Sequence, residues 1–239
     1  MLDEHVGRRA VGAGPLEAVL FDVDGTLCDS DPLHFEAFRD LLKEAGFQGG
    51  VPIDNGFYSK NLCGSLEVIY DALFPEDRRK ALQFMEDKEA YFQRQVSLEK
   101  LVPVSGLHDL CKWIEDKGIR RAAVTNSPRA NAEAMISAVG LSEFFEFVVL
   151  GEECERGKPY PDPYLKALKC LGVPAKRAMV FEDSSWGIKA GVAAGLPVVG
   201  LTTSKPEQKL LDAGASLVIK DFEDSQLWKI LEGIETPSS

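Results

Sequence analysis

Two aspartates that directly follow a short apolar run are the residues of this chain best suited to chemistry. Residues 18–21 are apolar without alternation, which predicts a strand buried on both faces of a parallel sheet. Asp22 and Asp24 come next, at the kind of strand end where open α/β sheets bind ligands. Two carboxylates this close raise each other's proton affinity unless a cation lies between them. An ordinary turn at Asp24-Gly25 is one interpretation, and a divalent metal site is the other.

A second polar cluster follows the strand expected at residues 120–125. Thr125, Asn126 and Ser127 precede Pro128, the expected first residue of a helix. Hydroxyl and amide groups beside the free N–H groups of a helix start form a cradle for phosphate. Capping of that helix by Asn126 or Ser127 is the alternative, and one turn can serve both purposes.

Lys158 and the pair Glu182-Asp183 complete the set. Lys158 lies in a loop with three prolines, which stiffen the backbone and present the ammonium to an anionic oxygen; a solvated surface lysine is the alternative. Glu182 and Asp183 end the strand expected at 178–183, so they would reach the same sheet edge as Asp22. Carboxylates of Asp22 and Asp183 with water suit the oxygen-only shell of Mg²⁺, whereas helix capping explains only one of these acids.

The elements that must position these residues change type along the chain. Helical patterns fill residues 31–98, with helices expected from Pro32, near 65–73 and at 78–98. After residue 98, helices and strands alternate, which predicts an α/β fold with a doubly wound parallel sheet. The further expected strands are 120–125, 147–151, 178–183, 197–200 and 217–219. The further expected helices are 106–117, 128–139, 162–171, 186–194, 207–213 and 227–231.

Composition restricts the class of partner and the compartment. The chain has 239 residues and a net charge of -11, which disfavours nucleic acid and anionic membranes because both would be repelled. Five well-separated cysteines suggest neither a disulfide framework nor a zinc site and favour a reducing compartment. Residues 1–14 contain acids and no apolar segment, so we expect a flexible tail without a signal peptide. We therefore expect a cytoplasmic protein. No segment approaches the length of a membrane span. We also expect a monomer, because no exposed apolar patch is evident.

In their order along the chain, the four clusters resemble the four motifs of the haloacid dehalogenase superfamily, over nearly the whole chain after about residue 16. The resemblance implies that Asp22 is the nucleophile that forms an aspartyl-phosphate, while Asp24 protonates the leaving oxygen and then activates water. Mg²⁺ would be held by the side chains of Asp22 and Asp183 and the main-chain carbonyl of Asp24, with Glu182 nearby. The phosphoryl group would be gripped by the remaining motif residues, Thr125, Asn126 and Lys158.

The position of the helical insert is similar to that of the small helical cap in the β-phosphoglucomutase-like branch of this superfamily. It implies a catalytic core of residues 15–31 and 99–239 and a cap of residues 32–98. Three positions in the cap resemble residues that act on the substrate: His34, Lys60 and Gly64. For His34, a role in the helical core or in capping is the alternative.

The cap also bears on the choice between phosphatase and mutase. β-Phosphoglucomutases carry an arginine shortly after the glycine of the cap loop, whereas this chain has Leu66-Glu67, and an acid there would repel a second phosphate. We therefore expect a Mg²⁺-dependent phosphatase of broad selectivity that acts on small sugar phosphates, most similar to the plant broad-range sugar phosphatases of this branch. The alternatives are a phosphosugar mutase and an inactive phosphate-binding module.

Overall fold

A computed structural model describes residues 15–62, 66–98 and 101–234. Contacts divide the chain into two compact units, which we call the core unit (residues 1–29 and 101–239) and the helical unit (residues 30–100). The sequence pattern predicts the two transitions at residues 32 and 98. The predicted tail, residues 1–14, lies outside the described residues.

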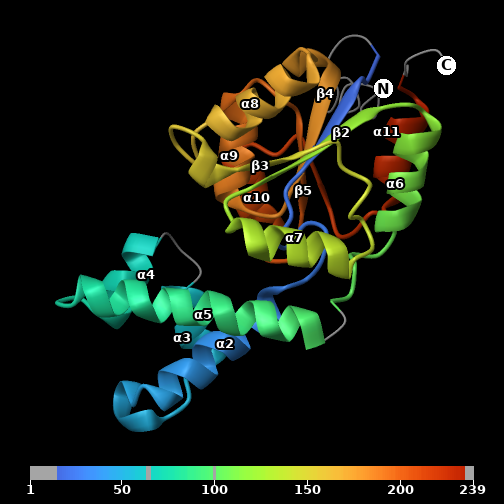
Figure 1. Cartoon of the computed structure of the whole chain (residues 1–239). Coiled ribbons are helices and arrows are strands. Elements are labelled where there is room, and N and C mark those ends of the chain that lie inside the picture. Colours follow the sequence, from blue (N-terminus) through green and yellow to red (C-terminus); the bar gives the residue numbers. More distant parts are fainter. Residues whose placement is uncertain (1–14, 63–65, 99–100, 235–239) are drawn as a thin grey trace. The chain divides into compact units, whose positions relative to one another are not determined.

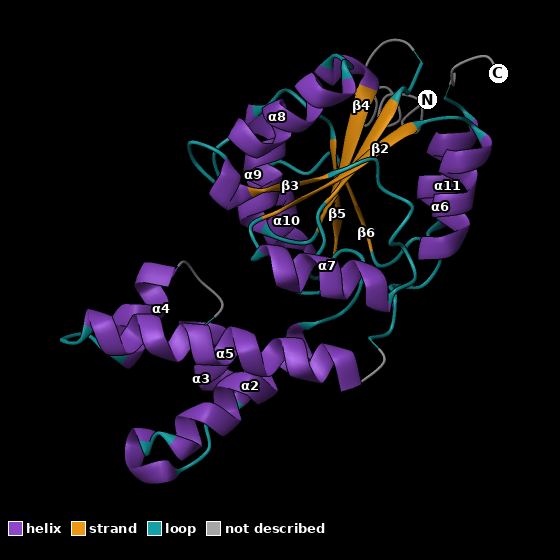
Figure 2. Ribbon diagram, viewed as in Figure 1, coloured by secondary structure: helices purple, strands orange, loops and turns teal. Residues whose placement is uncertain are grey.

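The core unit is built on one parallel sheet, drawn in orange in Figure 2. Its strand order is β3-β2-β1-β4-β5-β6. The strands are β1 (Ala18–Phe21), β2 (Arg120–Thr125), β3 (Val148–Leu150), β4 (Ala178–Glu182), β5 (Val198–Leu201) and β6 (Leu217–Ile219). Strands β1, β2 and β3 are added in one direction and β4, β5 and β6 in the other, which is the doubly wound arrangement. The predicted α/β fold is therefore confirmed.

Helices cover both faces of this sheet (Figure 1). On one face, Tyr164, Ile188 and Leu210 come from three helices and enter a single apolar cluster with strand residues such as Leu20. Those helices are α8 (Asp162–Leu171), α9 (Ser185–Ala193) and α10 (Glu207–Ala213); the other face carries α6 (Leu107–Asp116) and α11 (Ser225–Glu232). The remaining elements of the core unit are α7 (Arg129–Ala138), η2 (Gly151–Glu153) and η3 (Ala175–Arg177). None of the helices in the described part of the chain has the length and apolar character needed to cross a bilayer.

An aromatic cluster fills the other face directly beneath the strand ends. Side chains alternate between the two faces along a strand, so Phe21 points away from the cluster that contains Leu20. The Phe21 ring stacks on that of Phe181, with ring centroids 5.2 Å apart, and packs edge-on against Phe222 at 6.4 Å. This cluster holds the last residues of β1 and β4 against each other.

The helical unit contains α2 (Asp31–Glu44), η1 (Phe47–Gly50), α3 (Asn55–Asn61), α4 (Leu66–Leu73) and α5 (Arg78–Leu98). Its own core includes Phe38, Ile69 and Phe84. The sequence pattern predicts α2, α4 and α5 but not α3, because seven residues are too few to display a periodic apolar face. Its start is fixed by Asp54, whose side chain accepts the N–H of Phe57 at 2.7 Å.

The aromatic cluster generates a test of the fold. Phe222→Ala should lower the free energy of unfolding by about 3–5 kcal/mol, because Phe222 is fully buried and its loss leaves a cavity. Leu165→Ala is the control, since that side chain is 47% exposed and its loss should change stability by about 0.5 kcal/mol or less. Urea denaturation followed by circular dichroism measures both. Equal losses in the two variants would contradict the packing described here.

Candidate active site

The acids predicted from the sequence lie at the carboxyl ends of two adjacent strands. Asp22 directly follows β1 and Asp183 directly follows β4, and these strands pair in parallel with Phe21 level with Phe181. The strand order reverses between β1 and β4, and open α/β sheets bind ligands in the crevice at that point. One carboxylate oxygen each from Asp22, Glu182 and Asp183 lies within 4.8 Å of the others.

Lys158 brings a positive charge into this group of acids. Its Nζ donates hydrogen bonds to Asp22 Oδ1 at 2.5 Å, to Glu182 Oε1 at 2.6 Å and to the Val124 carbonyl oxygen at 2.7 Å. An ammonium has three N–H donors, so these contacts use all of them. The side chain is only 4% exposed, which excludes the alternative of a solvated surface lysine.

Asn126 holds the backbone of Lys158. Its Nδ2 donates to the Lys158 carbonyl oxygen at 3.0 Å, and the Lys158 N–H donates to its Oδ1 at 3.0 Å. Thr125 is buried, and its Oγ1 accepts the N–H of Ser127 at 3.0 Å, which leaves its own O–H proton outside that bond. The Thr125 hydroxyl therefore retains a donor for a phosphoryl oxygen, while the Asn126 amide is engaged by the lysine loop.

The ionisation of these groups reflects crowding of negative charge in a buried site. Burial raises the pKa of Asp22 to about 7; Lys158 opposes this effect, and Glu182 and Asp24 add to it. Burial likewise raises the pKa of Asp183 well above its usual range, with contributions from the charges of Asp22 and Glu182. Burial alone would lower the pKa of Lys158, but the two neighbouring carboxylates outweigh it and raise that pKa. The single ammonium of Lys158 thus does not offset the burial and mutual repulsion that raise the pKa values of Asp22 and Asp183.

The donor set fits a hard divalent cation. All candidate ligands are oxygens, and an added positive charge would relieve the repulsion that raises the two aspartate pKa values. Lys158 occupies Oδ1 of Asp22 and the Ser204 hydroxyl donates to Oδ2 of Asp183. Oδ2 of Asp22 accepts a long hydrogen bond from the Thr26 hydroxyl at 3.4 Å, and a carboxylate oxygen with one such partner still has a lone pair for a metal. Among the described residues, this is the group of His, Cys, Asp and Glu side chains suited to hold a metal ion.

Gly25 allows the turn after β1 to lie against Asp183. Its φ of +79° is in the left-handed region, and a Cβ at this position would overlap the carboxyl group of Asp183. Asp24 precedes this turn, and its charge acts on both Asp22 and Asp183. The main chain around Asp24 is therefore brought to the same pocket as the carboxylates of Asp22 and Asp183.

Glu182 differs from the two aspartates because the protein occupies both of its oxygens. Oε1 accepts from Lys158 at 2.6 Å and from the Tyr164 hydroxyl at 2.9 Å. Oε2 accepts from the Ser184 N–H at 3.2 Å and from the Ser184 hydroxyl at 3.0 Å. In this arrangement Glu182 orients Lys158, and a direct bond to a metal would require one of these contacts to open.

Three residues of the site are absent from the sequence prediction. Thr203 donates to the Gly25 carbonyl oxygen, and Ser204 donates to Asp183, so the loop after β5 supports the turn after β1 and the Asp183 carboxylate. These hydroxyls follow a strand, which is the signal that led to Thr125 and that could have identified them. Tyr164 gave no such signal, because it lies on the apolar side of α8 and reads as a core residue.

The three predicted substrate positions belong to the helical unit. His34 Nδ1 lies 2.8 Å from Lys88 Nζ, and its ring stacks on Phe92 with centroids 4.1 Å apart, so this histidine is built into that unit. Lys60 is exposed in the last turn of α3. Gly64 lies outside the described residues, as do the side chains of Leu66 and Glu67.

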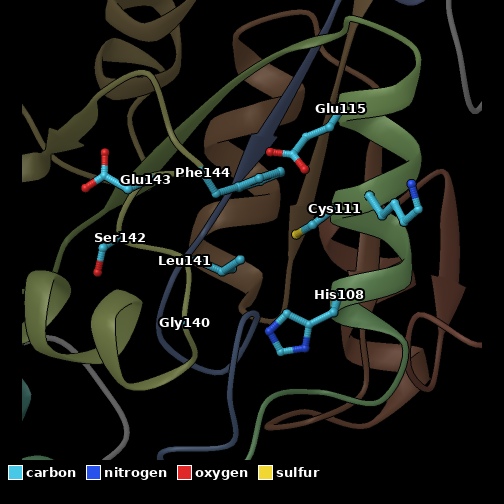
Figure 3. Close-up of a pocket in the computed structure, with 9 residues that line it drawn as sticks. His108, Cys111, Glu115, Gly140, Leu141, Ser142, Glu143 and Phe144 are labelled. Carbon is cyan, nitrogen blue, oxygen red and sulfur yellow. The ribbon is translucent and has the colours of Figure 1, made fainter.

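A separate cavity of about 400 Å³ opens between α6 and the segment that joins α7 to β3 (Figure 3). It is lined on the helix by His108, Cys111 and Glu115, and on the segment by residues 140–144. Burial raises the pKa of the Cys111 thiol to about 12, so this sulfur is a poor nucleophile at neutral pH. None of the residues predicted for the site lines this cavity.

Comparison with known proteins identifies the family. The model of the haloacid dehalogenase-like hydrolases matches residues 16–195, and this chain belongs to that family. It is 30% identical to a phosphorylated carbohydrates phosphatase of Thermotoga maritima over 87% of this chain and 96% of that protein. It is 32% identical to SUPPRESSOR OF QUENCHING 1, a chloroplastic protein of Arabidopsis thaliana, over 92% of this chain but 21% of that longer protein.

Solved structures share the fold. Crystal structures of CbbY from Rhodobacter sphaeroides, one with phosphate and one with xylulose-1,5-bisphosphate, superpose with a TM-score of 0.74. They are 30% identical in sequence and cover 87% of this chain and 96% of CbbY. The family resemblance and the α/β fold expected from the sequence are both confirmed.

Thermal unfolding with and without Mg²⁺ tests the excess of negative charge. Because folding raises the pKa of Asp22 from 3.8 to about 7, the folded state holds the proton of this carboxyl more tightly than the unfolded state does. The free energy of unfolding therefore includes the full contribution of neutral Asp22 below pH 3.8, and it loses this contribution as the pH rises through about 7. We expect Mg²⁺ to raise the melting temperature little at pH 5 and clearly more at pH 8, where the carboxyl is ionised.

Two variants complete that test. Asp22→Asn is neutral at every pH, so its Mg²⁺-dependent increase at pH 8 should be much smaller than that of the wild type. Asp116→Asn removes an exposed carboxylate and should behave as the wild type does. An equal effect of Mg²⁺ at both pH values, or no difference between Asp22→Asn and the wild type, would contradict the proposed cation site.

Proposed function

We propose that this protein is a Mg²⁺-dependent phosphatase that hydrolyses small sugar phosphates through a phospho-aspartate on Asp22. The observation that carries the proposal is the pocket at the ends of β1 and β4, where Asp22, Asp183 and the Lys158 ammonium meet. An ammonium beside a carboxylate nucleophile offsets the repulsion between that carboxylate and a phosphate ester. The site thus combines an anionic nucleophile with the positive charge that phosphoryl transfer needs.

The names of relatives support this class of substrate. The Thermotoga maritima protein is named a phosphatase of phosphorylated carbohydrates, and it matches this chain over nearly its entire length. The CbbY structures contain phosphate and a sugar bisphosphate. We infer a similar preference for small phosphorylated sugars here, with a broad range of substrates.

In the first step, a carboxylate oxygen of Asp22 attacks phosphorus and the bond from phosphorus to the sugar oxygen breaks. Asp24 donates a proton to that oxygen, so the sugar leaves as an alcohol. The Lys158 ammonium, whose Nζ lies 2.5 Å from Asp22 Oδ1, exchanges that hydrogen bond for one to a phosphoryl oxygen and so stabilises the charge on the transferred group. The Thr125 hydroxyl donates to the same oxygens.

In the second step, water attacks the phosphorus of phospho-Asp22 and the acyl-phosphate bond breaks. Asp24 takes a proton from that water, which returns Asp24 to its acid form and regenerates the Asp22 carboxylate. The covalent intermediate divides one difficult displacement into two easier ones. Asp24 serves both steps because its side chain does not bind the metal.

Mg²⁺ would be held by the side chains of Asp22 and Asp183 and by the main-chain carbonyl of Asp24. When bound, the ion neutralises charge on the phosphoryl oxygens. A cation also keeps Asp22 ionised at neutral pH, against the burial that raises its pKa to about 7. Glu182 holds Lys158 beside this site and completes the set of acids.

We assign the choice of substrate to three positions of the cap, residues 32–98, namely His34, Lys60 and Gly64. We also propose that the protein is a monomer and that it acts in the cytoplasm. The net charge of -11 disfavours nucleic acid and membranes as partners. The odd number and wide spacing of the five cysteines favour a reducing compartment.

The nucleophile is tested by release of inorganic phosphate from a panel of sugar phosphates. Asp22→Asn should lower kcat by on the order of 10³-fold or more, since an amide oxygen cannot form the acyl-phosphate. Asp116→Asn should retain wild-type rates because its carboxylate is exposed and paired with Lys112. Wild-type turnover by Asp22→Asn in excess Mg²⁺ would refute this mechanism.

The role of Asp24 is tested with p-nitrophenyl phosphate, whose leaving group needs little help from an acid. Asp24→Asn should still release nitrophenol in a burst of about one equivalent, and phospho-Asp22 should then accumulate because water lacks a base. Rapid quench and intact-protein mass spectrometry detect the burst and the added phosphoryl group. Steady turnover at the wild-type rate would exclude this role.

Product analysis separates hydrolysis from the mutase alternative. Phosphorus NMR of a reaction with a hexose 1-phosphate should show inorganic phosphate as the product. Accumulation of the hexose 6-phosphate instead would replace the phosphatase proposal with a mutase.

A further inference from the structure

Tyr164 is a buried residue with a polar contact that the reaction steps above do not use. It lies in the first turns of α8, its side chain has no exposed surface, and apolar residues of the sheet surround it. Its hydroxyl donates a hydrogen bond to Glu182 Oε1 at 2.9 Å. The phenol group therefore reaches out of an apolar core to one oxygen of one carboxylate.

That oxygen is also the one that holds Lys158. Glu182 Oε1 accepts from the Lys158 ammonium at 2.6 Å, while Oε2 accepts from the main chain and side chain of Ser184. A Cβ at Gly187 would overlap this carboxylate, so the backbone of α9 also lies against it. Glu182 has no exposed surface, and it is fixed in place by Tyr164, Ser184 and the backbone of α9.

Lys158 is in turn located from two directions. Asn126 fixes its main chain, and the ammonium lies among Asp22, Glu182 and the Val124 carbonyl oxygen. The ammonium nitrogen is also 5.2 Å from the centre of the Tyr164 ring, within range of a cation–π contact. Movement of Glu182 would therefore move the charge that faces Asp22.

We propose that Tyr164 is a positioning residue that acts through Glu182 to set the place of the Lys158 ammonium, and with it the strength of phosphate binding. A buried carboxylate oxygen that loses one donor depends more strongly on the donors that remain, and Lys158 is the other donor to Glu182 Oε1. Without the phenol hydroxyl, Glu182 Oε1 draws the ammonium toward itself and away from Asp22. The importance of Tyr164 for catalysis rests on the proposed phosphatase function. The positioning of Lys158 by Tyr164 does not depend on that function.

The test uses Tyr164→Phe, which removes one oxygen and keeps the ring. With Mg²⁺ present, calorimetry should show that inorganic phosphate binds about tenfold more weakly with an unchanged stoichiometry. In steady state, KM should rise more than kcat falls, because the ammonium contacts the phosphoryl group already in the bound substrate. The ¹⁵N NMR signal of Lys158 Nζ, assigned with Lys158→Arg, should shift in the variant.

Tyr91→Phe is the matched control. Its hydroxyl also donates to a carboxylate, that of Asp40 at 2.9 Å, but both residues lie in the helical unit. This variant should leave the phosphate affinity and the Lys158 signal as they are in the wild type. Tyr164→Leu, which removes the ring as well, should weaken phosphate binding at least as much as Tyr164→Phe.

A double-mutant cycle separates positioning from a structural role. In a Lys158→Ala background, Tyr164→Phe should have no further effect on phosphate affinity or on kcat/KM, because the residue acts through Lys158. The same fold-loss in both backgrounds would overturn the proposal. An unchanged dissociation constant with fewer binding sites would also overturn it, since that pattern marks partial unfolding, as would failure of both Tyr164 variants to fold.

The measurements also distinguish this proposal from the proposed function. If the wild type hydrolyses no phosphoester but Tyr164→Phe shifts the Lys158 signal and weakens phosphate binding, the positioning role stands and the phosphatase function fails. If hydrolysis is robust and the Lys158 signal and phosphate affinity are unchanged, the phosphatase function stands and the role of Tyr164 is refuted.

Discussion

The site depends on the balance between buried carboxylates and the few positive charges near them. Asp22, Glu182 and Asp183 present oxygens within 4.8 Å of one another, and Lys158 is the ammonium that bonds two of these acids. The pKa values of Asp22 and Asp183 are raised because burial and the neighbouring carboxylates disfavour their ionised forms, and the charge of Lys158 does not cancel this effect. The same excess of negative charge is what a bound divalent cation would relieve.

The fold creates this crowding from residues that are distant in sequence. Parallel strands end at one edge of the sheet, so Asp22 and Asp183 become neighbours although about 160 residues separate them. The aromatic packing of Phe21 and Phe181 fixes the strands just below these ends. Loops from β2 and β5 then supply groups that hold the acids and the lysine, among them Asn126 and Ser204. The packing of the sheet thus offsets the electrostatic repulsion between the carboxylates at the ends of its strands.

Features with a local cause could be predicted from the sequence. Asp22, Thr125 and Asp183 each follow an apolar strand, and the rule that polar strand ends meet at one edge needs no knowledge of tertiary contacts. The helix at 162–171 has the predicted bounds because Pro163 and Gly172 mark its ends locally. The family motifs reinforced these expectations, since their order fixed which strand ends belong together.

Features that depend on long-range packing could not be predicted. The sequence offers Asn126 as a phosphate ligand, but its side chain binds the main chain of Lys158, 32 residues away. The sequence places Glu182 near the expected metal, but it gives no signal of the hydrogen bond from Tyr164, which itself reads as core. His34 carries no signal of its contact with Lys88, which is 54 residues further along the chain. In each case the partner is supplied by another element, so the side chain's direction follows from tertiary structure.

A crystal structure of the protein with Mn²⁺ and inorganic phosphate tests the central claim most directly, because anomalous scattering locates the ion without assumption. The account predicts one strong peak about 2.1 Å from a carboxylate oxygen of Asp22 and another of Asp183, with phosphate within hydrogen-bond distance of Lys158 Nζ. A peak bound elsewhere, or phosphate held without contact to Lys158, would contradict it.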